Sequence, residues 1–272
     1  MTAFTSHFLF EFKTGLRNPS AMMMIYLLPI GFYAVMGLVM VAINPGYADI
    51  LIPSMIVFSS MSGSILGQPN GLVEMRESGI FRSFKINGVP AISILSIPAL
   101  SISIHAIITS VIIAITGGPF FNAAQPVNWW AMAFITILST FTFSTLGMLI
   151  GVVSSSSRAV VLWSQLVYLP SILLGGMMIP LELLPETVQK FSGLLPSSYV
   201  MQAFNGLGYQ RATAFNPWVS VIVLVASGIV ALGLSIYLFN WDSRNETRRG
   251  SPFLALLILV PYVAAVLYTN FA

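Results

Sequence analysis

The side chains able to do acid–base, nucleophilic or metal chemistry are few and scattered in this chain of 272 residues. The absence of cysteine excludes disulfides and thiolate metal sites, and the chain has only two histidines. The serines at 154–157 have no neighbouring base to activate a hydroxyl. An active site needs a clustered nucleophile and base, or a set of metal ligands. We therefore expect no catalytic residue, no metal site and no cofactor bound by this chain.

Two isolated polar residues remain as candidates. His105 lies within a long apolar stretch, where histidine can serve as a proton relay or ligand. We favour the alternative, a neutral imidazole that donates one hydrogen bond to a neighbouring helix. Asp49 begins another apolar stretch, and we expect it to cap a helix there rather than contact a substrate.

The segment 71–90 mixes charged and apolar side chains within a few residues. A short helix here, bounded by Gly79 and by Gly88-Val89-Pro90, would present both faces to a cytoplasmic partner. The alternative is a solvated loop whose charges only orient the adjoining helices, and composition alone favours it. The residues concerned are Glu74, Arg76, Glu77, Ile80, Phe81, Arg82, Phe84 and Lys85.

A second segment, 174–199, combines helix breakers with an apolar stripe. Gly175, Gly176 and Pro180 interrupt a helix, because glycine is flexible and proline lacks an N–H. Apolar residues then recur at helical spacing up to Pro196, and they are Leu184, Val188, Phe191 and Leu195. Such a stretch would lie on the outer surface or re-enter the membrane under a protein cover. The pattern favours this over a plain extracellular loop.

The elements that must position these residues are membrane spans. Residues 86–157 contain no Asp, Glu, Lys or Arg, hydrophobic residues make up 57% of the chain, and mean hydropathy is +0.90. A bilayer core penalises each such charge by roughly 2.5–3.5 kcal/mol, which explains the gap. Seven stretches are long enough to span, at about 21–43, 49–67, 91–115, 128–152, 159–179, 217–239 and 253–270. The last, with Pro261 at its middle, would span or lie flat, and we favour spanning.

Charge sets the orientation. With the N-terminus in the cytoplasm, nine Lys and Arg residues fall inside and only Lys190 and Arg211 outside. A spanning seventh segment then places the C-terminus outside. Basic residues lie at span ends and form no patch, so we expect no nucleic-acid partner. Before the first span, Phe4, Phe8, Phe12 and Leu16 predict an amphipathic helix on the inner membrane surface, over about 4–17 and ended by Asn18-Pro19.

Together, the two segments resemble the permeases of type-2 ATP-binding-cassette (ABC) exporters. Residues 76–81, Phe84 and Val89-Pro90 match the family's loop between spans two and three. Residues 175–199, from the glycine pair through Pro180 and Pro185 to the final Leu-Pro-x-x-Tyr at Tyr199, match its outer signature. The resemblance covers the chain to about residue 240.

The resemblance implies an all-α polytopic membrane protein with a six-span permease core over 1–240. The basic inner loop and additional hydrophobic helix over 241–272 depart from the family, whose members commonly have six spans with both ends inside. The resemblance also implies that a separate ATPase subunit binds ATP and Mg, that a second permease copy or relative pairs with this one, and that the complex sits in the plasma membrane. Spans one, two and five would line the route of a drug, lipid, peptide or lipid-linked glycan. Coupling to the ATPase would rest on Glu74, Arg76, Glu77, Gly79, Ile80, Phe81, Arg82 and Phe84. The outer gate would comprise Gly175, Gly176, Pro180, Leu184, Pro185, Val188, Phe191, Pro196 and Tyr199.

Two other functions stay open from the residues alone. A secondary transporter or channel would place polar groups inside its spans, and here only His105 is available. An accessory membrane subunit without transport activity would share the same scaffold.

Overall fold

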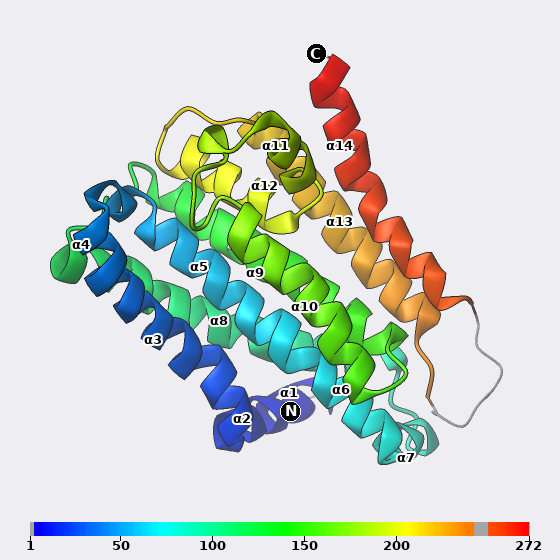
Figure 1. Cartoon of the computed structure of the whole chain (residues 1–272). Helices are drawn as coiled ribbons and strands as arrows, with labels where there is room; N and C mark the ends of the chain where they lie inside the picture. Colours follow the sequence, from blue (N-terminus) through cyan, green and yellow to red (C-terminus); the bar gives the residue numbers. More distant parts are fainter. Residues whose placement is uncertain (1–2, 242–249, 272) are drawn as a thin grey trace.

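The computed structural model describes residues 3–241 and 250–271, and every regular element among them is helical (Figure 1). Six helical stretches there are long and apolar enough to cross a membrane. They confirm an all-α polytopic membrane protein. We number them spans one to six: Pro19–Ile43, Leu51–Glu77, Ala91–Phe121, Trp129–Val153, Ser157–Leu174 and Pro217–Leu238.

Spans three to six are single α-helices, namely α8 (Ala91–Phe121), α9 (Trp129–Val153), α10 (Ser157–Leu174) and α13 (Pro217–Leu238). The first two spans are built differently, because π-helical turns interrupt them. Span one comprises α2 (Pro19–Met22), α3 (Leu28–Val35) and α4 (Val41–Ile43), with π turns at Met23–Leu27 and Met36–Met40. Span two comprises α5 (Leu51–Met61) and α6 (Gln68–Glu77), with a π turn at Ser62–Gly67.

Prolines explain the position of two of these turns. A π turn shifts the backbone hydrogen bonds by one residue, and a proline inside a helix leaves the carbonyl four residues earlier without its N–H donor. Pro29 follows the turn Met23–Leu27, and Pro69 follows the turn Ser62–Gly67. By contrast, α8 and α10 continue as α-helices through Pro98 and Pro170.

The N-terminal helix α1 (Ala3–Arg17) ends where the sequence predicted. Asn18 has an extended backbone, and its Oδ1 accepts hydrogen bonds from the amides of Ser20 at 3.0 Å and Ala21 at 3.2 Å. This side chain caps the next helix, and Pro19 occupies the first helical position, where its missing N–H costs nothing. The chain therefore turns from α1 into span one.

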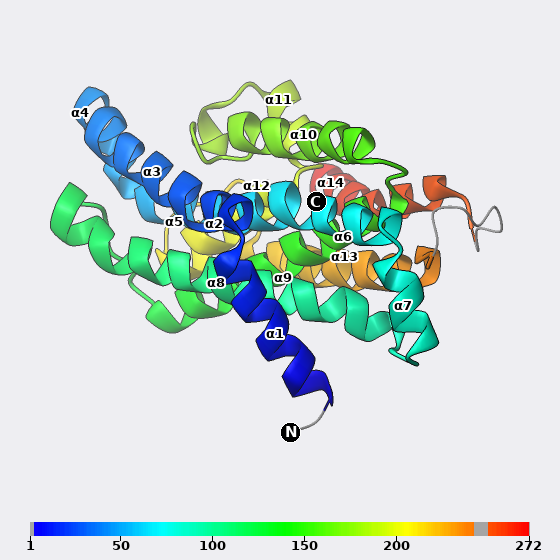
Figure 2. The same ribbon diagram turned by 90° about the horizontal axis from the view of Figure 1, so that it is seen from below.

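Span two lies at the centre of the bundle. Of its most apolar window, 89% is buried, compared with 28% for span one and 22% for span five. Figure 2 shows α3 and α10 on one side of the bundle and α8 on the other. Spans one and five therefore carry the most apolar surface that this chain leaves uncovered.

Span four packs tightly through small and hydroxylated residues. The Thr142 hydroxyl donates to the Leu224 carbonyl of α13 at 3.2 Å, and Ser144 donates to the Ala99 carbonyl of α8 at 3.1 Å. In lipid, helices gain little from apolar burial against one another, so close packing and such hydrogen bonds hold the bundle together.

The C-terminal segment forms the helical stretch Pro252–Leu259 and α14 (Val260–Phe271), which run back along α13 (Figure 1). Tyr262 of α14 contacts Tyr199, with ring centroids 5.6 Å apart. The apolar part, Pro252–Tyr268, is shorter than the six spans. That it crosses the membrane stays a prediction, and most of the basic loop before it, residues 242–249, lies outside the described residues.

Candidate functional site

The segment predicted to couple to an ATPase forms two helices rather than one. Span two continues through Glu77 as α6, so Glu74, Arg76 and Glu77 lie on its last turns. Gly79 then adopts the left-handed conformation, with φ 78°, and α7 (Ile80–Ile86) follows. Gly88 has φ 70° and closes α7, as predicted. A helix bounded by two such glycines is a defined structural element and not a solvated loop.

Arg76 is buried and serves the fold. Its guanidinium donates to the carbonyls of Val152, at 3.0 Å, and Ser154. These carbonyls stand at the C-terminal end of α9, where the last turn lacks backbone donors and the helix dipole favours a cation. Phe81 is also buried, and its ring packs against Phe239 at 5.3 Å. These two residues anchor the segment to spans four and six and are not accessible to a partner.

Most of the remaining members of the predicted coupling set are exposed, whereas Phe84 is half-buried. Glu74, Glu77, Ile80 and Arg82 are exposed at the end of α6 and on α7, together with Lys85. We call these five residues the coupling face. It combines both signs of charge with one apolar side chain, which suits a protein surface better than a lipid one.

Helix α1 joins the coupling segment to the membrane bundle. The His7 ring lies 5.6 Å from the ring of Phe84 on α7, and the Phe12 ring stacks on His105 of α8 at 4.2 Å. Glu11 is half-buried on the same helix, and burial raises the pKa of its carboxyl, while the nearby His7 partly offsets this. The helix predicted on the inner surface therefore also contacts α7 and span three.

His105 makes the predicted hydrogen bond to a neighbouring helix. Its Nδ1 lies 2.7 Å from the Tyr26 hydroxyl of span one, and the side chain is buried. Which partner donates depends on the imidazole tautomer. Among the described residues, no group of three His, Asp or Glu side chains is placed to hold a metal ion.

On the side predicted to be extracellular, α10 ends at Leu174, and the glycine pair turns the chain back. A Cβ on Gly175 would lie 2.1 Å from the Ser197 hydroxyl, so only glycine fits this close approach. Gly176 has φ 81°, which an L side chain rarely adopts. Tyr47, from the turn between spans one and two, donates its hydroxyl to the Met177 carbonyl at 3.1 Å and holds the segment in place.

Beyond Pro180, only the middle of the predicted stripe is helical. Helix α11 covers Glu186–Ser192 and so includes Val188 and Phe191, whereas Leu184 precedes it and Leu195 precedes α12 (Pro196–Ala203). Pro185 directly precedes α11, Leu184 and Val188 are half-buried, and the Phe191 side chain is 62% exposed. Pro196 lacks a backbone N–H and so favours the first turn of a helix, which explains why it starts α12.

The whole of α12 is buried within the protein. Tyr199 donates its hydroxyl to the Gly193 carbonyl at 2.8 Å and so ties α12 back to the end of α11. Its ring also stacks on Phe215 at 5.4 Å. The structure therefore brings the predicted outer-gate residues together around the end of span five.

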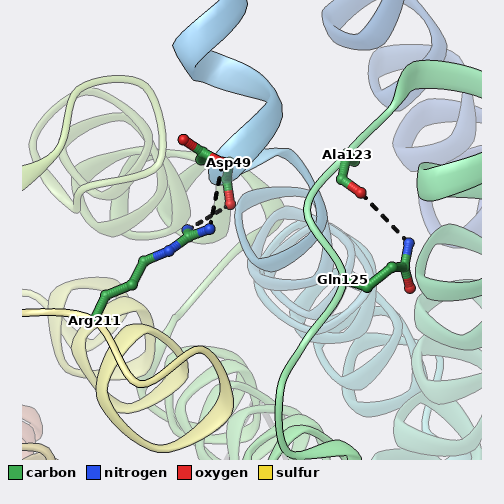
Figure 3. A network of polar contacts seen from close by, with 4 residues as sticks. All are labelled: Asp49, Ala123, Gln125 and Arg211. Atoms are coloured by element: carbon green, nitrogen blue, oxygen red, sulfur yellow. Dashed lines mark hydrogen bonds and ion pairs between the residues drawn. The ribbon is translucent and has the colours of Figure 1, made fainter.

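Sequence reasoning missed two polar contacts in this outer region. Arg211 pairs with Asp49 at 3.4 Å and also donates to the Asp49 backbone carbonyl at 2.7 Å (Figure 3). The prediction that Asp49 caps α5 is wrong, because Ile50 is the N-cap residue and no side chain caps this helix, while Asp49 pairs with Arg211. The second contact is buried Gln202, whose Oε1 accepts from the Ala214 amide at 2.7 Å and whose Nε2 donates to Glu182 at 3.2 Å. The available signal for the first pair was that Asp49 and Arg211 are among the few charged residues in the segments predicted to lie outside.

Spans one, two and five meet through aromatic rings where the substrate route was expected. Phe32 stacks on Phe58 at 4.4 Å, and Phe58 lies 5.9 Å from Tyr168. These rings come from α3, α5 and α10 respectively. Apolar side chains therefore close the junction of the three spans in this structure.

Comparisons with known proteins agree with this geometry. The chain is 25% identical over 233 residues to a Bacillus subtilis (strain 168) protein named "Putative transport permease YvfS", covering 84% of this chain and 93% of that protein. It is 24% identical over 215 residues to ABC transporter G family member 20 of Dictyostelium discoideum, covering 74% of this chain and 28% of that protein. A family model described as ABC-2 family transporter protein matches residues 41–237. The chain therefore belongs to the ABC-2 family of transporter permeases.

Proposed function

We propose that this permease exports a hydrophobic or amphipathic substrate, such as a drug, lipid, peptide or lipid-linked glycan, using ATP hydrolysed by a separate ABC ATPase subunit. The ATPase would bind the ATP and Mg. The coupling face carries this proposal: it is exposed, it mixes charges, and it lies at the end of the most buried span. Movement of α7 would therefore be transmitted through span two to the centre of the bundle.

Two permeases, identical or related, would pair through spans one and five, whose apolar surfaces this chain leaves uncovered. The substrate would pass where Phe32, Phe58 and Tyr168 meet, once these rings separate. The outer segment from Gly175 to Tyr199 would form the exit gate. We also propose that Pro252–Tyr268 crosses the membrane and places the C-terminus outside, because this stretch runs back along α13 toward Tyr199.

The test is charge reversal on the coupling face. The double variant Glu77→Lys/Arg82→Glu is expressed with its native ATPase, and co-purification and ATP hydrolysis by the complex are measured. Lys190→Glu, an exposed charge on the outer side, is the matched control. We expect the double variant to lose the ATPase and the control to retain it. If the double variant co-purifies with as much ATPase subunit as the wild-type permease does, the coupling role of this face is refuted. A wild-type permease that retains no ATPase subunit would instead favour an accessory or secondary-transport role.

A further inference from the structure

A buried backbone carbonyl in the π turn of span two accepts a hydrogen bond from another span. In an α-helix the carbonyl of Ile65 would accept from the N–H of residue 69, but residue 69 is proline and has none. The Ser164 hydroxyl of α10 supplies the donor, at 2.7 Å from the Ile65 oxygen. Ser164 is 2% exposed and Ile65 is fully buried, so water cannot replace this bond.

A similar contact occurs at one other proline. Pro29 lies four residues after Ile25, and the Thr109 hydroxyl of α8 donates to the Ile25 carbonyl at 3.1 Å. In both cases the donor comes from a segment distant in sequence, as expected where a membrane interior offers no water to an unpaired carbonyl.

The bond from Ser164 to Ile65 differs from the bond at Ile25 in the segments that it connects. Below Ile65, span two continues as α6 and leads directly to α7 and the coupling face. Beyond Ser164, α10 ends at Leu174 and leads directly through Gly175 to the segment predicted as the outer gate. At the same turn, Gly147 of α9 packs so closely that a Cβ there would lie 1.9 Å from the Ser64 oxygen. The turn is thus held between spans four and five.

We propose that Ser164 is a positioning residue that joins the π turn of span two, acting as a hinge, to span five, so that movement of α6 and α7 reaches the outer gate. This inference rests on the proposed function. A π turn contains one residue more than an α-helical turn of the same length, so it can rearrange while the helices on either side stay intact. Breaking the Ser164 bond would strand a carbonyl in an apolar interior, so the hinge and span five move together.

Four substitutions isolate the bond. Ser164→Ala removes the donor, whereas Ser164→Thr keeps a hydroxyl. Pro69→Ala restores a backbone N–H four residues after Ile65, so it should make Ser164 dispensable in the double variant Ser164→Ala/Pro69→Ala. The matched control is Ser235→Ala, because Ser235 is equally buried and donates at 2.7 Å to Ala231 of its own helix.

The natural absence of cysteine allows a direct measurement of gate movement. Spin labels are placed at Leu173→Cys and Leu183→Cys, two exposed positions on either side of the glycine turn. Their distance distribution is recorded by double electron–electron resonance in the complex with its ATPase, before and after addition of ATP with orthovanadate. ATP hydrolysis is measured on the same samples.

We expect ATP with orthovanadate to change the label distance in the wild-type, Ser164→Thr, Ser235→Ala and double-variant complexes. The Ser164→Ala complex should keep its ATPase and its hydrolysis but lose the distance change. A full distance change in Ser164→Ala, or none in the double variant, would overturn the role of Ser164. Failure of the wild-type permease to hold an ATPase, or to change distance at all, would instead overturn the proposed function, and the inference with it.

Discussion

The contact between spans four and two gives the sharpest prediction about stability. Gly147 and Gly151 are one turn apart on α9, in the small-xxx-small spacing that lets membrane helices approach closely. A Cβ on Gly147 would lie 1.9 Å from the Ser64 carbonyl oxygen and 2.8 Å from its carbon. Backbone cannot rotate away as a side chain can, so Gly147→Ala must push the two helices apart by about 1 Å.

The expected cost follows from two opposing effects. Overpacking of this kind costs about 3 kcal/mol at the upper end of its usual range, and alanine recovers roughly 1 kcal/mol of helix propensity. We therefore expect Gly147→Ala to lower the free energy of unfolding by about 2 kcal/mol, a substantial part of the ~5–15 kcal/mol typical of folded proteins.

Two other glycines provide a graded comparison. A Cβ on Gly151 would lie 2.9 Å from the flexible end of Leu72 and 3.1 Å from the backbone of Pro69, so Gly151→Ala should cost about 1 kcal/mol or less. A Cβ on Gly233 of α13 meets nothing within 4 Å, so Gly233→Ala should stabilise by about 0.5–1 kcal/mol. The assay is equilibrium unfolding in mixed micelles with increasing dodecyl sulfate, followed by tryptophan fluorescence. A Gly147→Ala protein as stable as Gly233→Ala would refute the reasoning.

Three further predictions concern other parts of the chain. Arg76→Met should lower the free energy of unfolding by about 2 kcal/mol in the same assay, because the carbonyls of Val152 and Ser154 lose a charged donor; an unchanged value would contradict that role. Burial raises the pKa of Glu11, so docking of α1 should be strongest at low pH and weaken as pH rises through that pKa. Hydrogen exchange of α1 should show this dependence, and Glu11→Gln should abolish it; a dependence that persists would argue against Glu11. Finally, Asn270→Cys should react with a membrane-impermeant thiol reagent in intact cells, and a residue that stays unlabelled would place the C-terminus inside.

Much of the fold could be read from composition and spacing. The charge-free stretch at 86–157 and the lengths of the apolar segments predicted spans, and six of these are confirmed. Gly79 and Gly88 correctly predicted the bounds of α7, because a left-handed backbone strongly favours glycine. His105 was correctly expected to bond to a neighbouring helix, since a polar side chain in a span needs a partner.

Other assignments needed the packed structure. Arg76 and Phe81 carry the same chemistry as their exposed neighbours, and only the positions of α9 and Phe239 show that they are buried. Asp49 has the residue type and place of a helix cap, but Arg211, 162 residues away, takes it instead. The apolar residues from Leu184 to Leu195 predicted one continuous helix, because their spacing cannot show that α11 ends at Ser192.

The amino-acid sequence by itself determined which stretches are apolar enough to enter the membrane and where prolines remove a backbone N–H, and its charges predict which ends face the cytoplasm. These are local consequences of hydrophobicity, charge and missing N–H groups. The tertiary structure decided which distant side chain bonds to a given carbonyl: Thr109 to Ile25, Arg211 to Asp49 and Ser164 to Ile65. A hydroxyl or guanidinium reaches its acceptor only when two segments far apart in the chain pack side by side, and no local pattern specifies that pairing.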